Sequence, residues 1–129
     1  MFFRTVQIRK AGKKGRGVFA GEDIAAGSLI ERAPVIVLSP EDRLVAEKTK
    51  LYNYIFSWGQ GDEEAGAVAL GYISMYNHAS PSNAEYTMFF DKEFMEIKAM
   101  VNIPKGAEIT LNYSAHWQEE KPVWFKMKD

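Results

Sequence analysis

Short segments of alternating apolar and polar residues, separated by glycine-containing turns, constrain the fold of this chain more than any other feature. Val6 and Ile8 alternate with polar residues, as in a half-buried strand, and a basic, glycine-rich stretch over residues 10–17 ends that pattern. Further strands are expected at 18–20 and 28–38, the second of which ends in a β-branched run. Strands this short pair in several small sheets, so the sequence predicts a mostly β domain of the β-rich α+β class.

One helix is expected in the middle of the chain. Ser39 suits the N-cap of a helix, and the proline and two acidic residues that follow it favour a first helical turn. Leu44, Leu51 and Ile55 then recur at helical spacing. The pattern therefore predicts a helix over about 40–53 with one apolar face.

The second half of the chain is expected to be mostly strand. Tyr54, Phe56 and Trp58 alternate with other residues, so a strand start overlaps the expected end of the helix. Residues 85–90 and 94–101 flank a polar turn and predict a hairpin. The residues expected to share one face of its second strand are Met95, Ile97, Ala99 and Val101.

One pattern occurs twice, because Ile24–Ile30 and Ile103–Ile109 carry isoleucine, glycine and isoleucine in matching places. The glycines, Gly27 and Gly106, are each expected at positive φ in a turn that joins two short strands. A solenoid needs three or more repeats, so a shared turn solution is preferred to a duplication or a repeat architecture.

Composition disfavours several classes of protein. The 129 residues, of which 47% are hydrophobic and 26% charged, suit one globular domain rather than a disordered or coiled-coil chain. A net charge of −1 provides no field for gathering a phosphate backbone, so nucleic acid is not an expected partner. With no cysteine and two histidines, neither a disulfide framework nor a metal site is expected.

Targeting signals are not evident either. The longest apolar run, residues 33–38, is too short to cross a bilayer, so no membrane partner is expected. The first residues lack the apolar region of a signal peptide. We therefore expect an intracellular protein, with the cytoplasm as the default location and a nuclear or host-targeted location as the alternative.

The first candidate site is a glycine pair. Gly15 and Gly17 alternate with the basic residues Lys14 and Arg16, and glycines at this spacing let backbone groups approach a ligand closely. A plain turn is the simpler interpretation of this pair alone.

Two further segments carry polar or aromatic side chains. Asn77 and His78 stand between an apolar run and a strand, where they would either cap buried backbone groups or bind a ligand. Tyr113 ends a turn and strand that begin near Lys105. Taken alone, such a tyrosine is a packing residue with its hydroxyl in water.

Together, and in this order, the three segments resemble the motifs of the SET domain, the fold of a large class of protein-lysine methyltransferases that use S-adenosylmethionine. Residues 14–20, with the sequence KGRGVFA, are similar to the first motif of that family. Residues 76–84 resemble its R-F-x-N-H-S-C-x-P-N-A motif, and residues 106–113 resemble its G-E-E-L-T-F-D-Y motif. The resemblance extends from about Arg4 to Trp117.

The resemblance implies a SET fold of several small sheets, with a knot-like C-terminal segment and one helix in an inserted middle region over about 39–66. The whole chain, 1–129, would form a single domain similar to the small stand-alone SET proteins of viruses and bacteria. In such proteins a C-terminal aromatic segment replaces a missing wall, and His116–Trp117 and Trp124–Phe125 are the candidates here. The latter pair also suits a symmetric contact, so a homodimer is expected.

The resemblance also implies roles for individual residues. Tyr113 would be the catalytic tyrosine, which aligns the methyl group and the substrate amine. The residues that would bind the cofactor are Lys14, Gly15, Arg16, Gly17, Asn77, His78, Tyr113 and Trp117. The candidates for the channel that receives the substrate lysine are Tyr54, Tyr86 and Leu111, with core packing as the alternative for each.

The implied function is S-adenosylmethionine-dependent N-methylation of a lysine in a histone or another protein, with S-adenosyl-L-homocysteine as the product. The sequence departs from the family pattern at Ala79, Ser82 and Asn112, where Ser, Pro and Asp are usual. A catalytically weak, SET-like module that binds a peptide is therefore the alternative. Tyr113 favours the enzyme, because a module without catalysis has little physical need of that phenol.

Overall fold

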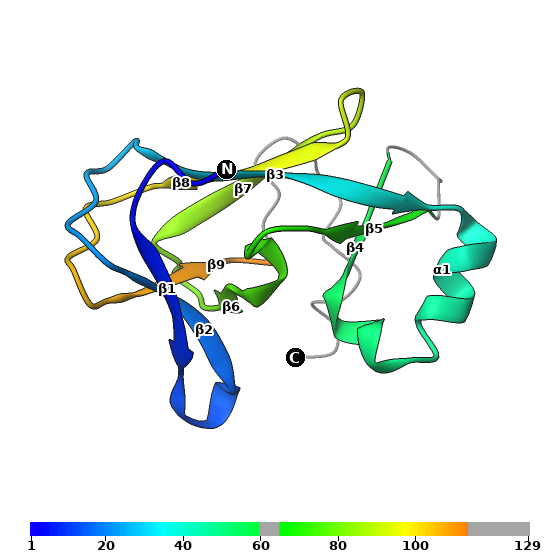
Figure 1. The fold of residues 1–129 in the computed structure, drawn as a ribbon, viewed down its shortest axis with the longest axis horizontal. Coiled ribbons are helices and arrows are strands. Elements are labelled where there is room, and N and C mark those ends of the chain that lie inside the picture. The colour runs from blue at the N-terminus through cyan, green and yellow to red at the C-terminus, as the bar shows by residue number, and fades with distance from the viewer. Residues whose placement is uncertain (60–64, 114–129) are drawn as a thin grey trace.

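The computed structural model describes residues 1–59 and 65–113, which form two sheets and one α-helix (Figure 1). A four-stranded sheet has the order β1-β2-β9-β6, and a five-stranded sheet has the order β4-β5-β3-β8-β7. The strands are β1 (Val6–Lys10), β2 (Arg16–Ala20), β3 (Leu29–Leu38), β4 (Ile55–Ser57), β5 (Gly66–Ala69), β6 (Asn77–His78), β7 (Ala84–Phe89), β8 (Phe94–Ala99) and β9 (Glu108–Leu111). The helical elements are α1 (Pro40–Ala46) and the 3₁₀ turns η1 (Gly12–Lys14), η2 (Lys50–Tyr54) and η3 (Ile73–Met75). The expected mostly β architecture is confirmed.

Strand β3 joins the two halves of the larger sheet and runs toward α1 in Figure 1. Its first part, residues 29–34, pairs with β8, and its second part, residues 35–38, pairs with β5. The register of the first pairing shifts between Leu29 and Glu31. As a result two consecutive side chains, those of Ile30 and Glu31, are fully buried.

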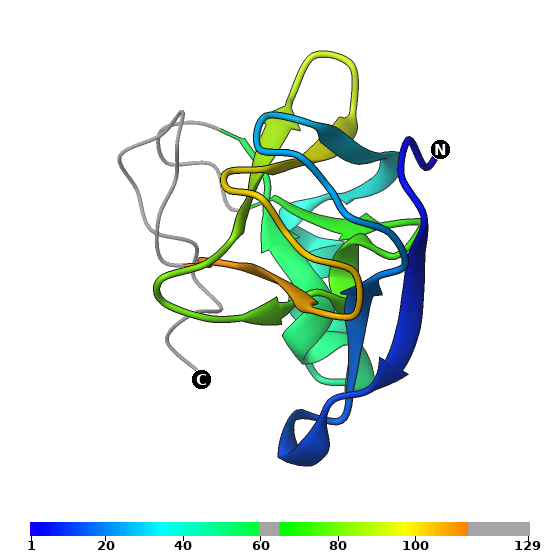
Figure 2. The same cartoon turned by 90° about the vertical axis from the view of Figure 1, so that its left-hand side faces the viewer.

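The repeated isoleucine-glycine pattern forms a pair of facing turns. Ile24 and Ile103 form an antiparallel bridge in which each backbone N–H donates to the other residue's carbonyl at 2.8 Å. Gly27 has a φ of 85° and Gly106 a φ of 91°, so the predicted left-handed conformation is confirmed at both positions. Figure 2 shows the two connections side by side.

A parallel pairing brings the second and third motifs together. Strand β6 runs alongside β9, with Asn77 opposite Thr110 and His78 opposite Leu111. The Asn83 side chain holds this arrangement, because its Nδ2 donates to the Glu108 carbonyl at 2.8 Å and its Oδ1 accepts from the Thr110 backbone N–H at 2.8 Å. The amide of Asn83 thus replaces a missing neighbouring strand for part of β9.

The predicted hairpin is confirmed as β7 and β8, which pair from Ala84 opposite Ala99 to Phe89 opposite Phe94. The expected inward face is correct at Met95, Ile97 and Ala99 and wrong at Val101, which is 51% exposed. The reason is that β8 ends at Ala99, so Val101 lies two residues beyond the strand.

The predicted helix is only partly correct. Ser39 caps α1 as expected, its Oγ accepting from the Asp42 backbone N–H at 3.1 Å, but α1 ends at Ala46 and a separate 3₁₀ turn follows. Thr49 causes the break, because its hydroxyl donates to the Ala46 carbonyl at 2.6 Å and accepts from the Leu51 backbone N–H at 3.1 Å.

The apolar face expected for this helix is also wrong. Leu44 is 61% exposed and Leu51 is 44% exposed, whereas Ile55 is fully buried as the first residue of β4. The helical spacing therefore ran across three different elements, α1, η2 and β4. In the part of the chain that the structure describes, no helix has the length and apolar character needed to span a membrane.

Candidate active site

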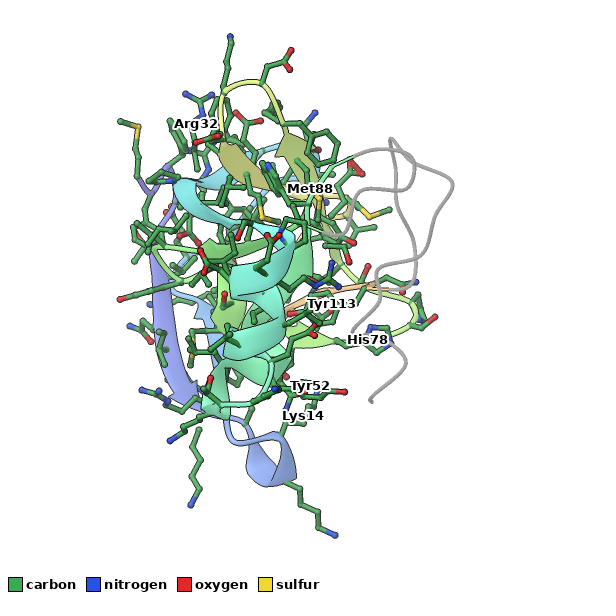
Figure 3. The ribbon with its side chains drawn as sticks, turned by 90° about the vertical axis from the view of Figure 1, so that its right-hand side faces the viewer. Lys14, Arg32, Tyr52, His78, Met88 and Tyr113 are labelled. Carbon is green, nitrogen blue, oxygen red and sulfur yellow. The ribbon has the colours of Figure 1, made fainter. Side chains whose placement is uncertain are left out.

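Tyr113 lies two residues beyond the end of β9 and is held at three points. Its backbone N–H donates to Nδ1 of His78 at 3.1 Å, and its hydroxyl donates to the carbonyl oxygen of Tyr76. Its ring stacks on the His78 ring, with the centroids 5.8 Å apart. This arrangement follows from the register of β6 and β9, which places His78 opposite Leu111, two residues before the tyrosine. Figure 3 shows His78 and Tyr113 on the same side of the molecule.

The contact with Tyr113 fixes the orientation of the His78 ring. Because Nδ1 accepts a hydrogen bond, the proton of the neutral imidazole is assigned to Nε2. The half-buried ring is thus anchored through one nitrogen and keeps its other nitrogen as a donor.

Aromatic rings enclose Tyr113 on the side of the larger sheet. The ring centroid of Phe56 lies 6.3 Å from that of Tyr113, and the ring centroid of Tyr86 lies 6.4 Å from it. Phe56 and Tyr86 are themselves 6.1 Å apart and each is 2% exposed. We call Phe56, Tyr86 and Tyr113 the aromatic enclosure.

The three expected channel residues differ in their positions. Tyr86 belongs to the aromatic enclosure. Leu111 is fully buried in β9, and its carbonyl accepts from the Ala79 backbone N–H at 3.0 Å. Tyr54 is 36% exposed and is the last residue of η2. Phe56 was not predicted, although its alternation with Tyr54 and Trp58 indicated a strand with one buried face.

We call residues 14–17 the glycine loop. This loop contacts Asn77 across β9. The Nδ2 group of Asn77 donates to the carbonyl of Arg16 at 3.1 Å and to Oε2 of Glu108 at 2.7 Å. Oε1 of Glu108 forms an ion pair with Nζ of Lys14 at 3.3 Å. The first, second and third motifs therefore converge at one carboxylate. Glu108 was not named as a site residue, although it stands within the third motif.

Gly17 is required at this meeting point for its lack of a side chain. A Cβ built there would lie 2.4 Å from Oε2 of Glu108 and 2.7 Å from Nδ2 of Asn77. Gly15 has a different role, because its φ of 81° requires glycine while the space beside it is open. Arg16, between them, is exposed.

A second carboxylate lies behind the site, inside the protein. Glu31 is fully buried, and its two oxygens accept from the Tyr76 hydroxyl at 2.8 Å and from the Tyr72 backbone N–H at 2.7 Å. Gly71 provides room for it, since a Cβ there would lie 2.2 Å from Oε2 of Glu31. Sequence reasoning missed Glu31 and Tyr76; the available signal was a charged residue on the inward alternation of Ala33 and Val35.

Burial dominates the electrostatics of this pair. Loss of hydration raises the pKa of Glu31, and the hydrogen bonds from Tyr72 and Tyr76 oppose that increase. Burial and then the neighbouring charge of Glu31 raise the pKa of Tyr76 well above its usual value. The phenol of Tyr76 therefore keeps its proton near neutral pH.

Four of the expected site residues belong to the C-terminal part of the sequence. Trp117, predicted to contact the cofactor, and His116, Trp124 and Phe125, predicted to form the C-terminal wall, lie outside the described residues. The homodimer expected from Trp124 and Phe125 stays a prediction.

Comparisons with known proteins agree with this geometry. The family model of the SET domain matches residues 15–114. A histone-lysine N-methyltransferase of Schizosaccharomyces pombe, specific for lysine-37 of H3, is 31% identical over 118 residues, which cover 90% of this chain and 78% of that protein.

Solved structures show the same fold. A candidate histone methyltransferase of Plasmodium falciparum matches with a TM-score of 0.69 and 26% identity, over 90% of this chain and 98% of the other. A chain of ctPRC2, the Polycomb Repressive Complex 2 of Chaetomium thermophilum, was solved bound to S-adenosylmethionine. It matches with a TM-score of 0.71 and 22% identity over 97% of this chain and 16% of the other. The chain described here belongs to the SET domain family of protein-lysine methyltransferases.

Proposed function

We propose that this chain is an S-adenosylmethionine-dependent protein-lysine N-methyltransferase that releases S-adenosyl-L-homocysteine. One observation carries the proposal: three segments far apart in sequence meet around β9. Strand β2, with Arg16 and Gly17, pairs with one edge of β9, and β6, with Asn77 and His78, pairs with the other. Tyr113 lies two residues beyond the end of β9 and contacts His78 of β6.

The charges around the glycine loop fit the methionine end of the cofactor, which carries a carboxylate and an ammonium group. The carboxylate would pair with Lys14 or Arg16, and the ammonium group with Glu108. Gly15 and Gly17 let the backbone of the loop approach the ligand closely. When bound, S-adenosylmethionine supplies the methyl group on a positively charged sulfur.

Asn77 and His78 would contact the cofactor with different groups. The Asn77 amide nitrogen is engaged by Arg16 and Glu108, so its Oδ1 is the atom left to accept from the cofactor. His78 donates from Nε2, because Nδ1 is engaged by Tyr113. These assignments make Asn77 the connection between the glycine loop and the ligand.

The substrate amine has to be neutral to attack a methyl group, yet a free lysine has a pKa of about 10.4. The aromatic enclosure favours the neutral form, because it removes water from the amine. The positive charge of the cofactor acts in the same direction. The rings of Phe56 and Tyr86 would line the path of the lysine side chain.

The hydroxyl of Tyr113 would align the amine. Its proton is directed at the Tyr76 carbonyl, so its oxygen presents lone pairs to other groups. An N–H of the substrate amine can donate to that oxygen, which turns the nitrogen lone pair toward the methyl group. Holding two reactants in line in this way can lower a barrier by roughly 7–11 kcal/mol, so positioning supplies most of the proposed acceleration.

The proposed substrate is a protein lysine, and histone H3 is the first candidate because the Schizosaccharomyces pombe relative is an H3-specific enzyme. Such a substrate requires an intracellular location with access to histones. The departure at Ala79 does not weaken this proposal, since its contact with β9 uses the backbone N–H rather than a side chain.

The test is transfer of a radiolabelled methyl group from S-adenosylmethionine to histones and to proteins of a whole-cell lysate. We expect label in lysine residues and loss of that label in Tyr113→Phe. Calorimetric titration with S-adenosylmethionine measures binding of the cofactor separately from methyl transfer. Binding of the cofactor and of histone peptides without transfer would contradict the enzyme and favour the peptide-binding module.

A further inference from the structure

A chain of two hydrogen bonds connects the interior of the protein to Tyr113. The Tyr76 hydroxyl donates to Oε1 of Glu31 at 2.8 Å, and the Tyr76 carbonyl accepts from the Tyr113 hydroxyl. Glu31 is fully buried and Tyr76 is 1% exposed. Tyr76 therefore connects the two residues, because its side chain contacts Glu31 in the core and its backbone carbonyl contacts Tyr113 at the site.

Glu31 holds the turn η3 at both of its ends. Tyr72, whose backbone N–H donates to Oε2 of Glu31, is the residue before η3, and Tyr76 is the residue after it. One carboxylate therefore fixes the entry and the exit of a three-residue turn. The segment leaving that turn is β6, which contains Asn77 and His78.

A buried carboxylate is costly, and an apolar side chain at this inward position of β3 would be the simpler way to fill the core. Gly71 enlarges the space at Oε2 rather than filling it. The arrangement therefore favours a rigid acceptor at this place over optimal apolar packing. Its fixed partners are the two residues that flank η3.

We propose that Glu31 and Tyr76 are positioning residues for methyl transfer, which hold the Tyr76 carbonyl where it orients the hydroxyl of Tyr113. This inference rests on the proposed function, since it assigns the Tyr113 hydroxyl a role in alignment. Neither residue touches the substrate or the cofactor in this scheme. Their effect passes through the carbonyl of Tyr76.

The first variant is Tyr76→Phe, which keeps the ring and deletes the hydroxyl that reaches Glu31. We expect kcat to fall by about 10-fold to 100-fold, the range produced by a small misplacement of a reacting group. The Kd for S-adenosylmethionine, measured by calorimetry, should stay within about twofold of the parent value.

Glu31→Gln is the conservative variant. Its amide can still accept from the Tyr72 N–H and keep a neutral hydrogen bond with Tyr76, so we expect kcat between those of the parent and Tyr76→Phe. Ile24→Val is the matched control, because it removes one buried methyl group from the pair of facing turns, away from Glu31 and Tyr76. It should lower Tm slightly and leave kcat unchanged.

A double-variant cycle separates positioning from general destabilisation. If Tyr76 acts through Tyr113, deleting its hydroxyl in a Tyr113→Phe background should cause no further loss in single-turnover rate. Multiplying losses would overturn the proposal, as would an active parent with an equally active Tyr76→Phe. A parent with no methyl transfer would instead overturn the proposed function and, with it, the positioning role.

Discussion

Two glutamates lie on opposite sides of the segment that carries Asn77, and they differ in burial and in the kind of partner. Glu31, behind the segment, is fully buried and accepts from one backbone N–H and one phenol. Glu108, in front of it, is half-buried and contacts the side chains of Asn77 and Lys14. The partners of the inner carboxylate are a backbone N–H and a buried phenol, whereas Lys14, the cation paired with the outer one, is exposed.

The difference indicates a structural role for Glu31 and is consistent with the ligand-binding role proposed for Glu108. A carboxylate without water is expensive to leave unpaired, so the partners of Glu31 are held in place by that cost. A carboxylate in contact with water loses little when its partner moves, so Glu108 can exchange Lys14 for a charged ligand. The following substitutions test this division.

The largest effect is expected for Tyr113→Phe, the residue supported by the inner carboxylate. The ring and its stacking on His78 remain, but the hydroxyl that would align the amine is lost. We expect kcat to fall by about 100-fold or more and the Kd for S-adenosylmethionine to change little. An equally active variant would show that the reaction does not use this hydroxyl.

The next effect concerns the outer side of the segment. Asn77→Ala removes the amide that connects the Arg16 carbonyl to Glu108, so we expect S-adenosylmethionine to bind about tenfold more weakly, as measured by calorimetry. Asn102→Ala is the matched control, because this asparagine makes one comparable bond, from the Ala26 backbone N–H, in the turn pair. Equal affinities for the two variants would remove Asn77 from the cofactor site.

The inner carboxylate should also make stability depend on pH. Because burial raises the pKa of Glu31, the folded protein binds a proton at this position more strongly than the unfolded chain does. In the unfolded chain a glutamate has a pKa of about 4.3. The stabilisation that this proton provides is fully present below the unfolded pKa, and it is lost as the pH rises through the pKa of Glu31 in the folded protein. Glu31→Gln does not ionise, so the difference in unfolding free energy between the variant and the parent should grow over that window. Urea unfolding at several pH values measures it, and parallel curves would contradict the assignment.

Local patterns predicted the elements that depend on local rules. The hairpin β7–β8 follows from alternation with a period of two, and the facing turns follow from glycines that must adopt positive φ at Gly27 and Gly106. Of the residues that contact Tyr113, His78 and Tyr86 were predicted from the sequence, whereas Tyr76 and Phe56 were missed. The second and third motifs converge because β6 pairs in parallel with β9.

The rest depends on contacts between distant residues, which periodicity does not reveal. The predicted helix was too long because the Thr49 hydroxyl competes with the helical hydrogen bonds, and because Leu44 and Ile55 belong to different elements. Glu31 and Tyr76 are 45 residues apart, so no short sequence window contains both partners of their bond. Buried polar pairs of this kind become visible only when the strands are placed.

The smallest effect is expected for Glu108→Gln, and it tests the contrast directly. The glutamine keeps an oxygen that can accept from Asn77 but loses the ion pair with Lys14, whose side chain is 49% exposed. Pairs exposed to this degree contribute between zero and about 1 kcal/mol, so the unfolding free energy should change by less than about 1 kcal/mol. A modest, salt-sensitive loss of S-adenosylmethionine affinity should remain, because the ammonium group of the cofactor would no longer meet a negative charge. If Glu108→Gln instead destabilised the protein with the pH dependence expected of Glu31, the outer carboxylate would belong to the framework as well, and the division between the two would fail.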